Sequence, residues 1–588
     1  MSLDVWGFRD THFQFSSSGA VELTGDRYTL SGHELPALTP WMSGVLGVPL
    51  STETRVESNY PQPIPEPLRD HDFLNAIRGF LAAEQIAEDP ELRLRHGHGH
   101  TQEEMYEIKH GRLDRIPDMV VFPSSDEQVR MLVEAALGHN VCLIPYGGGT
   151  NVTGALRCPS IESRSIVSVD MERMNRILWI DPVNRMAHIQ AGAVGRNIVS
   201  QLAEHGFTMG HEPDSIEFST LGGWIATNAS GMKKNKYGNI EDLVLDLNVV
   251  TPAGELSRGS IVPRESTGPD PRRSFFGSEG NLGIITSATV KIFPLPELQH
   301  YGSVIFRSFE EGLNFLYELA LQGDLPASVR LVDNLQFQFS QALKPKSVGW
   351  KTYKRAAERF YVTRLKGYDP TRMVACTLLF EGTKAEVARQ ESRLYPLARR
   401  HGGMAAGSEN GLRGYQLTFS IAYIRDFVMD HFVIAESFET SVAWSAALKL
   451  CENVKRRVAA EHTSHRLPGK PFISCRITQL YQTGVCIYFY YAFYFKGVEN
   501  PAQAYLEIED AARDEILKSG GSLSHHHGIG KIRRKFVPRI MSVPSVQWNA
   551  ELKRAIDPQN VFGCGNTDTT STRPDQCDYL NHQKLLPS

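Results

Sequence analysis

The sequence predicts an α+β protein of several domains, and three observations support this fold class. The chain has 588 residues, of which 41% are hydrophobic and 22% charged, a balance typical of globular rather than disordered proteins. From residue 115 onward, short apolar runs bounded by proline or glycine occur among segments with helical periodicity. Strand-like and helix-like segments are thus mixed along a chain long enough for about three to five domain-sized units.

The overall composition excludes several classes of protein. The formal net charge is −4, so no excess of positive charge attracts nucleic acid or an anionic membrane. The longest apolar run, Val485–Phe495, is shorter than the ~20 residues of a membrane-spanning helix. The eight cysteines include no CxxC pair, which argues against a zinc or iron–sulfur site built from paired cysteines. Their dispersal predicts free thiols in a reducing compartment.

Residues 1–114 are predicted to form a peripheral N-terminal segment. Alternate prolines between residues 61 and 67 indicate an extended strap. The apolar stretch Leu35–Leu50 could dock onto the body of the protein or contact lipid. Three histidines alternate with glycines and could bind a metal or form a polar loop: His96, His98 and His100. The first ten residues are mixed and charged and lack a signal-peptide core.

A glycine-rich loop follows the strand predicted at Val141–Pro145. It consists of Pro145, Tyr146, Gly147, Gly148, Gly149, Thr150 and Asn151. Three successive glycines allow a tight turn and let backbone N–H groups approach an anion without obstruction by Cβ atoms. A pyrophosphate group would suit this loop, although a purely structural turn could also use three glycines. The loop is neither GxGxxG nor a Walker sequence, so the common nucleotide fingerprints do not apply.

Two later segments have the composition expected of backbone packed against a large planar cofactor. Residues 210–231 are dense in glycine and small hydroxyl residues, and residues 277–286 form a second glycine-containing segment. The candidate binding residues of the two segments are His211, Asp214, Ser215, Thr220, Gly223, Thr227, Ser230 and Gly231, followed by Glu279, Gly280, Gly283, Ile284 and Ile285.

In this order and spacing, the three segments resemble the FAD domain of the vanillyl-alcohol oxidase / p-cresol methylhydroxylase superfamily. The resemblance implies that FAD is the cofactor, that the glycine loop wraps its pyrophosphate, and that the later segments line the flavin and its ribityl chain. Some members hold the flavin covalently, and His211 could serve as the attachment point. The predicted parts are residues 115–296, the two-part FAD-binding domain; residues 297–500, an α+β cap for the substrate; and residues 501–588, a C-terminal segment that carries a histidine triplet.

The cap and the C-terminal segment contain unusual strings that narrow the resemblance. These strings are residues 327–334, 421–426, 437–441, 486–490 and 520–530. Together with residues 230–242 they resemble the alkyldihydroxyacetonephosphate synthase family, from about residue 98 to residue 562. The resemblance implies that the acyl chain of acyl-dihydroxyacetone phosphate is exchanged for a long-chain fatty alcohol in ether lipid biosynthesis. It also implies that FAD is not turned over as an oxidant and that its N5 bonds to C1 of the substrate.

The predicted catalytic residues are Tyr488, His525, His526, His527 and Arg425. If residues 486–495 form a strand, a period of two places Tyr488, Tyr490 and Tyr494 on one face and apolar side chains on the other. The same period sets the middle histidine of the triplet opposite the other two. An imidazole that titrates near ~6.5 can accept or donate a proton at neutral pH. A metal site would need further ligands, and the sequence shows none, so no metal is predicted.

The substrate phosphate requires a cationic partner, because a phosphomonoester carries about two negative charges at neutral pH. Arg330, Arg425 and Lys531 are the candidates. Arginine can bind phosphate oxygens in a two-pronged geometry that lysine cannot copy. The resemblance implies that Arg425 lies at the active site and that Arg330 matters for function. Alternatively, Arg330 could form a structural ion pair with Asp333.

The resemblance also implies partners and a location. Both substrates carry long chains, so we expect peripheral, hydrophobic contact with a membrane; a homodimer and a complex with the dihydroxyacetone phosphate acyltransferase are compatible with the family, and nucleic acid is not expected. The family works on the lumenal side of the peroxisome or glycosome membrane, although residues 586–588 are not an SKL-type signal. Two alternatives remain: a flavin dehydrogenase or oxidase for a hydroxy acid such as D-lactate or glycolate, and a lipid-binding protein with structural FAD.

Overall fold

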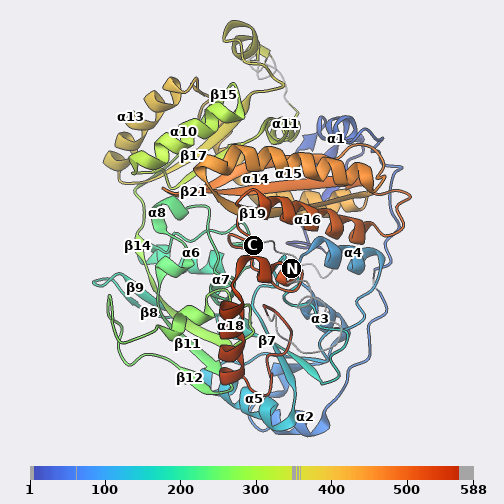
Figure 1. Cartoon of the computed structure of the whole chain (residues 1–588), viewed down its shortest axis with the longest axis vertical. Helices are drawn as coiled ribbons and strands as arrows, with labels where there is room; N and C mark the ends of the chain where they lie inside the picture. The colour runs from blue at the N-terminus through green and yellow to red at the C-terminus, as the bar shows by residue number, and fades with distance from the viewer. Residues whose placement is uncertain (1–4, 61, 347–352, 354–355, 358, 568–588) are drawn as a thin grey trace, which may run out of the picture.

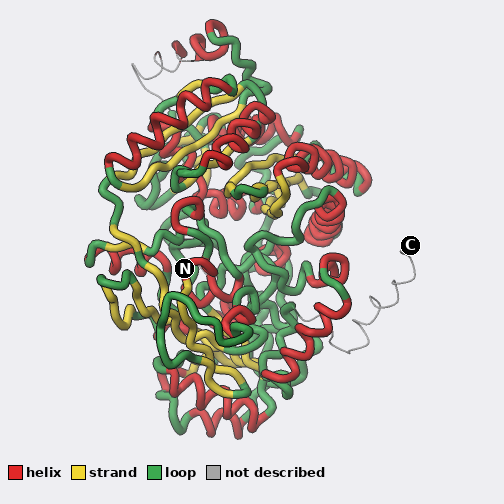
Figure 2. Tube along the Cα trace, turned by 60° about the vertical axis from the view of Figure 1, so that its left-hand side comes forward, coloured by secondary structure: helices red, strands yellow, loops and turns green. Residues whose placement is uncertain are grey.

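The computed structural model describes residues 5–60, 62–346, 353, 356–357 and 359–567. Residues 86–294 contribute three sheets, one of them only two-stranded, to a lower part, and residues 298–518 form an upper part around one larger sheet (Figure 1). The zone between the two parts consists mainly of loops (Figure 2). Among the described residues, no helix is both long and apolar enough to span a bilayer.

The first lower sheet has the order β4-β5-β7-β6, and β7 pairs in parallel with both β5 and β6. Its strands are β4 (Ile86–Ala87), β5 (Met119–Val121), β6 (Cys142–Tyr146) and β7 (Ile166–Asp170). Helix α5 (Asp126–His139) connects β5 to β6. Ser125 caps this helix by accepting a hydrogen bond from the N–H of Gln128, and the apolar face of the helix is buried against the sheet. Because β6 leads directly into the glycine loop, that loop starts from a fixed, buried strand.

The second lower sheet is antiparallel and has the order β12-β11-β13-β9-β8. Its strands are β8 (Ile177–Asp181), β9 (Met186–Gln190), β11 (Val244–Thr251), β12 (Gly254–Leu256) and β13 (Ile284–Lys291). Helices α6 (Gly195–Glu204) and α7 (Leu221–Thr227) bury apolar side chains in the core of this sheet. Thr220 caps α7 by accepting from the N–H of Gly223. The second and third predicted FAD-binding segments are therefore anchored on α7 and on the start of β13.

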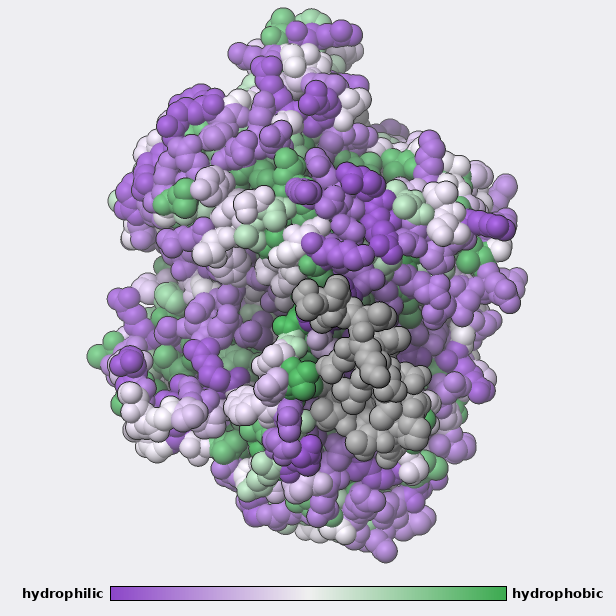
Figure 3. Space-filling model, viewed as in Figure 1, coloured by the Kyte–Doolittle hydropathy of each residue, from purple (hydrophilic) through white to green (hydrophobic). Residues whose placement is uncertain are grey.

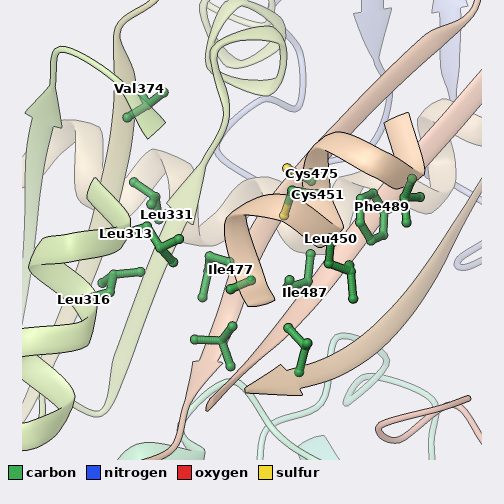
Figure 4. Packing of buried hydrophobic residues seen from close by; sticks show 14 of the residues in the cluster. Leu313, Leu316, Leu331, Val374, Leu450, Cys451, Cys475, Ile477, Ile487 and Phe489 are labelled. Carbon is green, nitrogen blue, oxygen red and sulfur yellow. The ribbon is translucent and has the colours of Figure 1, made fainter. Parts of the chain in front are cut away.

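The upper sheet has the order β18-β15-β17-β16-β20-β21-β19. Its strands are β15 (Leu298–Phe306), β16 (Ser328–Val332), β17 (Val374–Gly382), β18 (Met404–Ala405), β19 (Val433–Ala443), β20 (Phe472–Leu480) and β21 (Gly484–Tyr494). One face is covered by α10 (Phe309–Gln322), α13 (Lys384–Arg400), α15 (Trp444–Ser464) and α16 (Pro501–Lys518), and the other carries α11 (Asn334–Ala342) and α14 (Ser408–Met429). Figure 4 shows the helix-covered core, in which Leu313 lies beside Leu331 and Leu450 lies beside Ile487. Alternation along β21 sends Ile487 and Phe489 into this core and Tyr488 and Tyr490 to the opposite face.

The apolar stretch Leu35–Leu50 packs onto the body of the protein. Its helix α1 (Leu38–Leu46) buries Leu38, Met42 and Leu46 in a cluster shared with α14 and the end of β21. The structure therefore favours docking over lipid contact for this stretch. Other elements of the N-terminal segment are β1 (Phe13–Phe15), β2 (Val21–Leu23), β3 (Glu34–Leu35), α2 (His71–Ile77), α3 (Pro90–His96) and α4 (Gln102–His110).

The histidines that alternate with glycines lie at the end of α3 and in the loop that follows it, and this loop is buried. His96, His98 and His100 are each 1–3% exposed. His96 Nε2 lies 2.7 Å from the Asp170 carboxylate, and His100 lines the central cavity described below. The glycines between these histidines allow close packing: a Cβ at Gly97 or Gly99 would collide with neighbouring atoms.

The C-terminal segment crosses from the upper to the lower part. After α16, the histidine triplet lies in a series of bends rather than in a strand. The chain continues through α17 (Val537–Ile540) and α18 (Val543–Ile556), and then Val561 and Phe562 enter the core of the first lower sheet. The cysteines in the described residues are free and buried, as predicted. Cys577 and residues 586–588 lie outside the described residues.

Candidate active site

A cavity of about 420 Å³ lies between the glycine loop of the lower part and the exposed face of β20 and β21 in the upper part. A second cavity, of about 980 Å³, adjoins it between α1, α11 and α14. The residues that line both cavities are Trp41, Arg330, Thr418, Phe419, Ile421 and Arg476. The two spaces therefore meet at a boundary that includes two arginines.

The glycine loop forms one wall of the first cavity. All seven predicted loop residues, from Pro145 to Asn151, line it. A Cβ at Gly148 would collide with the carbonyl oxygen of Phe218, and Gly149 has a φ of +68°, a conformation that favours glycine. The glycines thus let the loop pack closely against Phe218 and turn while it lines the cavity, which is the form that a pyrophosphate cradle requires. The loop fits FAD on this criterion.

Most of the other predicted FAD-binding residues line the same cavity. They are Asp214, Ser215, Thr220, Gly223, Thr227, Ser230, Glu279, Gly280, Gly283, Ile284 and Ile285. His211 and Gly231 lie behind this lining. The His211 ring packs against Trp224 with the ring centroids 4.8 Å apart, and its ring nitrogens have no hydrogen-bond partner within the described part of the chain. Burial lowers the pKa of His211 to about 3, so this imidazole is neutral at physiological pH.

The upper sheet presents a row of polar side chains to the cavity. In the strand register, Arg476 of β20 pairs with Tyr488 of β21, and Tyr488 pairs with Glu439 of β19. Residues directly opposite on antiparallel strands point to the same face of a sheet. Arg330 of β16 lies on this face as well, diagonal to Arg476, because Val332 is the partner of Arg476. Sequence analysis missed Arg476 and Glu439. Glu439 reaches Tyr488 through the register of β19, which is distant in the chain, and Arg476 reaches it through the register of β20, the strand just before β21.

Tyr488 lies at the centre of the site. Its hydroxyl is 2.5 Å from Nε2 of His526 and 3.3 Å from Nε2 of His527. His525 is directed elsewhere, with its Nε2 2.6 Å from the hydroxyl of Tyr481. The period of two therefore assigned the triplet wrongly: the bends bring the second and third histidines together at Tyr488, while the first contacts the second through Nδ1 and contacts Tyr481 through Nε2.

Burial sets the protonation of this group. It lowers the pKa of all three imidazoles, that of His525 to about 3, below the ordinary value expected from sequence. It also raises the pKa of Tyr488 well above the usual value for a phenol. At neutral pH the site thus contains a protonated tyrosine between two neutral imidazoles, which is an arrangement that can relay a proton.

Glu439 holds the histidine triplet in place. Its carboxylate accepts hydrogen bonds from the Ser524 hydroxyl (2.6 Å), the N–H of His525 (2.6 Å) and the N–H of His527 (3.1 Å). The side chain is completely buried, so these donors replace the water that the carboxylate gives up. The signal in the sequence was the unusual string 437–441, which contains an acid within a strand-like run.

Two of the predicted cationic residues, Arg425 and Lys531, are held by other groups of the protein. Arg425 lies between carboxylates, with Asp426 at 3.0 Å and Glu436 at 3.2 Å. Lys531 points away from the cavity and donates to the carbonyl oxygens of Gly154 and Ala155. Neither arrangement leaves a charge directed at the cavity without a partner.

Arg330 and Arg476 are directed at the boundary of the two cavities. Arg330 donates to the Thr418 hydroxyl and lies 4.9 Å from the Tyr415 ring centroid. The predicted alternative pair with Asp333 is wrong, because Asp333 pairs with Lys455. Arg476 pairs with Asp214 at 3.1 Å and covers the Tyr488 ring at 4.8 Å.

Comparison with known proteins assigns the class first. Residues 117–260 match the family model "FAD binding domain", and residues 295–567 match "FAD linked oxidases, C-terminal domain". A structure of p-cresol methylhydroxylase superposes with a TM-score of 0.65 over 85% of this chain and 96% of its own, at 15% identity, and shows the same fold. The protein is a flavoprotein of the vanillyl-alcohol oxidase / p-cresol methylhydroxylase type, and its cofactor is FAD.

Closer relatives narrow the class to one family. An alkyldihydroxyacetonephosphate synthase from Caenorhabditis elegans is 44% identical over 564 residues, which cover 95% of this chain and 94% of the relative. A solved structure of an alkyldihydroxyacetonephosphate synthase superposes with a TM-score of 0.83 at 29% identity, covering 95% of this chain and 98% of its own. The chain belongs to the alkyldihydroxyacetonephosphate synthase family.

Proposed function

We propose that this protein is an alkylglycerone-phosphate synthase, which replaces the acyl chain of acyl-dihydroxyacetone phosphate with a long-chain fatty alcohol. The observation that carries the proposal is the Tyr488–His526–His527 group, which faces a cavity walled by the FAD cradle on one side and by two arginines on another. FAD bound in this cradle supplies an electron-poor ring that can accept a carbon nucleophile without net oxidation.

The tyrosine–histidine group would move the proton at C1 of the substrate. A hydrogen next to the ketone must leave before C1 can act as a nucleophile. Tyr488 is protonated, so it serves as a relay: its oxygen accepts the C1 proton while its own proton passes to Nε2 of His526 or His527. The reverse transfer returns a proton to C1 at the end of the cycle. Because the site is buried, bulk water does not compete for this proton.

The phosphate of the substrate would bind at Arg330 and Arg476. Both guanidinium groups are buried, at 3% and 4% exposure, and both line the boundary between the two cavities. Burial lowers the pKa of Arg330, and the nearby positive charge of Arg476 lowers it further. An anion bound between the two arginines would offset this repulsion between like charges. Arg425, by contrast, is already neutralised by two carboxylates and would orient the site rather than bind phosphate.

The alkyl chains would lie along the apolar walls formed by α1, α11 and α14. The apolar residues on these walls are Trp41, Met42, Val45, Leu46, Phe339, Ile421, Ile424 and Val428. They continue from the Tyr488 side of the cavity toward the N-terminal segment. A polar centre with an apolar extension matches substrates that carry a charged head and a long chain.

Contact with a membrane would involve a different element from the one that sequence suggested. The excursion formed by residues 359–365 projects from the top of the upper part, where Figure 3 shows hydrophobic residues at the tip. Phe360 is 57% exposed and Leu365 66%, and neighbouring residues of the excursion line the second cavity. From the family resemblance we further propose the lumenal side of a peroxisome or glycosome membrane, a homodimer, and contact with the dihydroxyacetone phosphate acyltransferase.

The proposal is tested by product analysis in D₂O. The purified protein is incubated with acyl-dihydroxyacetone phosphate and a labelled fatty alcohol, and we expect an ether product that carries deuterium at C1, with no oxygen uptake. A product with only protium at C1 would exclude the proton relay. Bleaching of the flavin by D-lactate or glycolate, without ether product, would instead establish the oxidase alternative.

A further inference from the structure

Three potential metal ligands converge directly behind the catalytic tyrosine. One nitrogen each of His525 and His526 and the sulfur of Cys486 lie within 4.8 Å of one another. Cys486 is two residues before Tyr488 on β21, so it points to the same face of the sheet, and it is completely buried. The sequence analysis predicted no metal because it found no further ligand near the triplet. The structure supplies one in Cys486, which is 39 residues from the triplet in the chain and adjacent to it in the fold.

The two imidazoles are oriented as metal ligands usually are. Their Nδ1 atoms face each other at 2.8 Å. The opposite nitrogens are already held, since Nε2 of His525 contacts the Tyr481 hydroxyl and Nε2 of His526 contacts the Tyr488 hydroxyl. In metal sites the second ring nitrogen of a histidine is held in this way, which fixes the ring and its tautomer. Two nitrogens at about 2.0–2.1 Å from one tetrahedral ion lie somewhat farther apart than here, so a small outward shift of the rings would admit the ion.

The chemistry of the three ligands selects a particular class of cation. One sulfur and two neutral imidazoles suit Zn²⁺, Cd²⁺ or Cu⁺, whereas Mg²⁺ and Ca²⁺ require oxygen ligands. Burial keeps both imidazoles neutral, which is the form that binds metal. Burial raises the pKa of the Cys486 thiol well above its usual value, so the entering ion must displace this proton, which would leave with water shed from the hydration shell of the ion; one retained water would be the fourth ligand.

We propose that Cys486, His525 and His526 form a binding site for one thiophilic cation, such as Zn²⁺, and that occupation of this site inhibits the enzyme. The inhibition follows from the tautomer of His526. An ion on Nδ1 forces the ring proton onto Nε2, and Nε2 is the atom that must accept a proton from Tyr488. The binding part of this inference is independent of the proposed function, and the inhibition part rests on it.

Cadmium titration of the FAD-loaded protein tests the binding part. A Cd²⁺–thiolate bond gives an ultraviolet absorption band, and we expect the band to saturate at one equivalent. Cys486→Ser should abolish this band, and Cys564→Ser, which changes another buried thiol, should leave it as in the wild type. No band in the wild type, or an equal band in Cys486→Ser, would overturn the site.

Inhibition by Zn²⁺ tests the second part. We expect micromolar-range titration to lower turnover of the wild type, a chelator to restore it, and Mg²⁺ to have no effect. The concentration for half inhibition should rise at least tenfold in Cys486→Ser and Cys486→Ala and stay unchanged in Cys564→Ser. If Cd²⁺ binds in a Cys486-dependent way but no inhibition occurs, the binding site stands, and the proposed effect on proton transfer from Tyr488 to His526 is overturned.

Discussion

The lower and upper parts of this protein build their halves of the active site in different ways. The lower part uses continuous stretches of backbone, in which Gly148 and Gly149 let the chain pack closely and turn where it lines the cavity. The upper part uses single side chains from separate strands, such as Arg476, Tyr488 and Glu439 in one row across the sheet. The backbone cradle would bind the cofactor through the shape of the chain, so a change of shape there should affect cofactor binding. The row of side chains carries the groups that we propose for proton transfer and substrate binding, so a change there should affect the reaction. We therefore expect mutations in the lower half to reduce cofactor binding and mutations in the upper half to reduce turnover.

The largest effect is expected in the backbone half. Gly148→Leu should eliminate FAD binding, because the side chain would have to occupy the space of the Phe218 carbonyl or of the pyrophosphate. Flavin absorbance of the purified protein measures the result. Gly138→Leu is the matched control, since a Cβ there meets no atom within 4 Å, and it should stay yellow. Full flavin content in Gly148→Leu would contradict the assignment of the loop.

The side-chain half should lose activity without losing cofactor. Tyr488→Phe removes the hydroxyl between His526 and His527, and we expect turnover to fall by about 10²–10⁴-fold while FAD remains bound. Tyr491→Phe, on the core face of the same strand, serves as the control. Deuterium exchange at C1 of the substrate should disappear together with turnover. Turnover within a few-fold of the wild type would remove Tyr488 from the mechanism.

A smaller effect should separate the two substrates. Arg476→Lys retains the charge but loses the two-pronged geometry, so KM for acyl-dihydroxyacetone phosphate should rise about 10–100-fold, as expected for a lost charge-assisted hydrogen bond. KM for the fatty alcohol should not change, because the alcohol carries no phosphate. Arg457→Lys on α15 provides a control with a half-buried ion pair away from the cavity. An equal rise of both KM values would indicate a general distortion of the cavity.

The smallest effect is a pH dependence of stability at the junction of the two parts. Glu279 accepts hydrogen bonds from the N–H groups of Ile529 and Gly530, yet burial raises its pKa from 4.5 to about 7. A raised carboxyl pKa stabilises the folded state below pH 4.5, and this stabilisation is lost as the pH rises to about 7. The shift corresponds to at most about 3 kcal/mol.

Glu279→Gln should remove this dependence. Relative to the variant, the wild type should lose a few degrees of Tm between pH 5 and pH 8, and scanning fluorimetry at several pH values measures the difference. Glu127→Gln is the control, because Glu127 is exposed on α5. If the wild type instead becomes more stable than the variant as the pH rises, the fold favours the ionised form of Glu279 and the prediction is wrong.

The same comparison explains how far the sequence could predict the site. Seven contiguous residues from Pro145 to Asn151 form one wall of the cavity, so a local pattern was sufficient to predict the segment that we propose as the FAD cradle. Tyr488 and the triplet were predicted from unusual strings and a resemblance. Arg476 and Glu439 were missed because they reach Tyr488 through strand register, which pairs Tyr488 with a residue 49 positions away in the case of Glu439 and 12 positions away in the case of Arg476. The triplet was assigned to the wrong faces because a strand period was applied to bends.

The hydrogen bond between Leu143 and Val561 has a consequence for how the protein is made. The N–H of Leu143, in the strand that leads into the glycine loop, donates to the carbonyl of Val561 at 2.9 Å, and Phe562 completes the core beneath that strand. The strand that leads into the cradle therefore lacks this bond, and the core beneath it, until residues 561–562 have been synthesised and have folded back onto β6. A chain truncated before Val561 should consequently fail to retain flavin and be purified colourless.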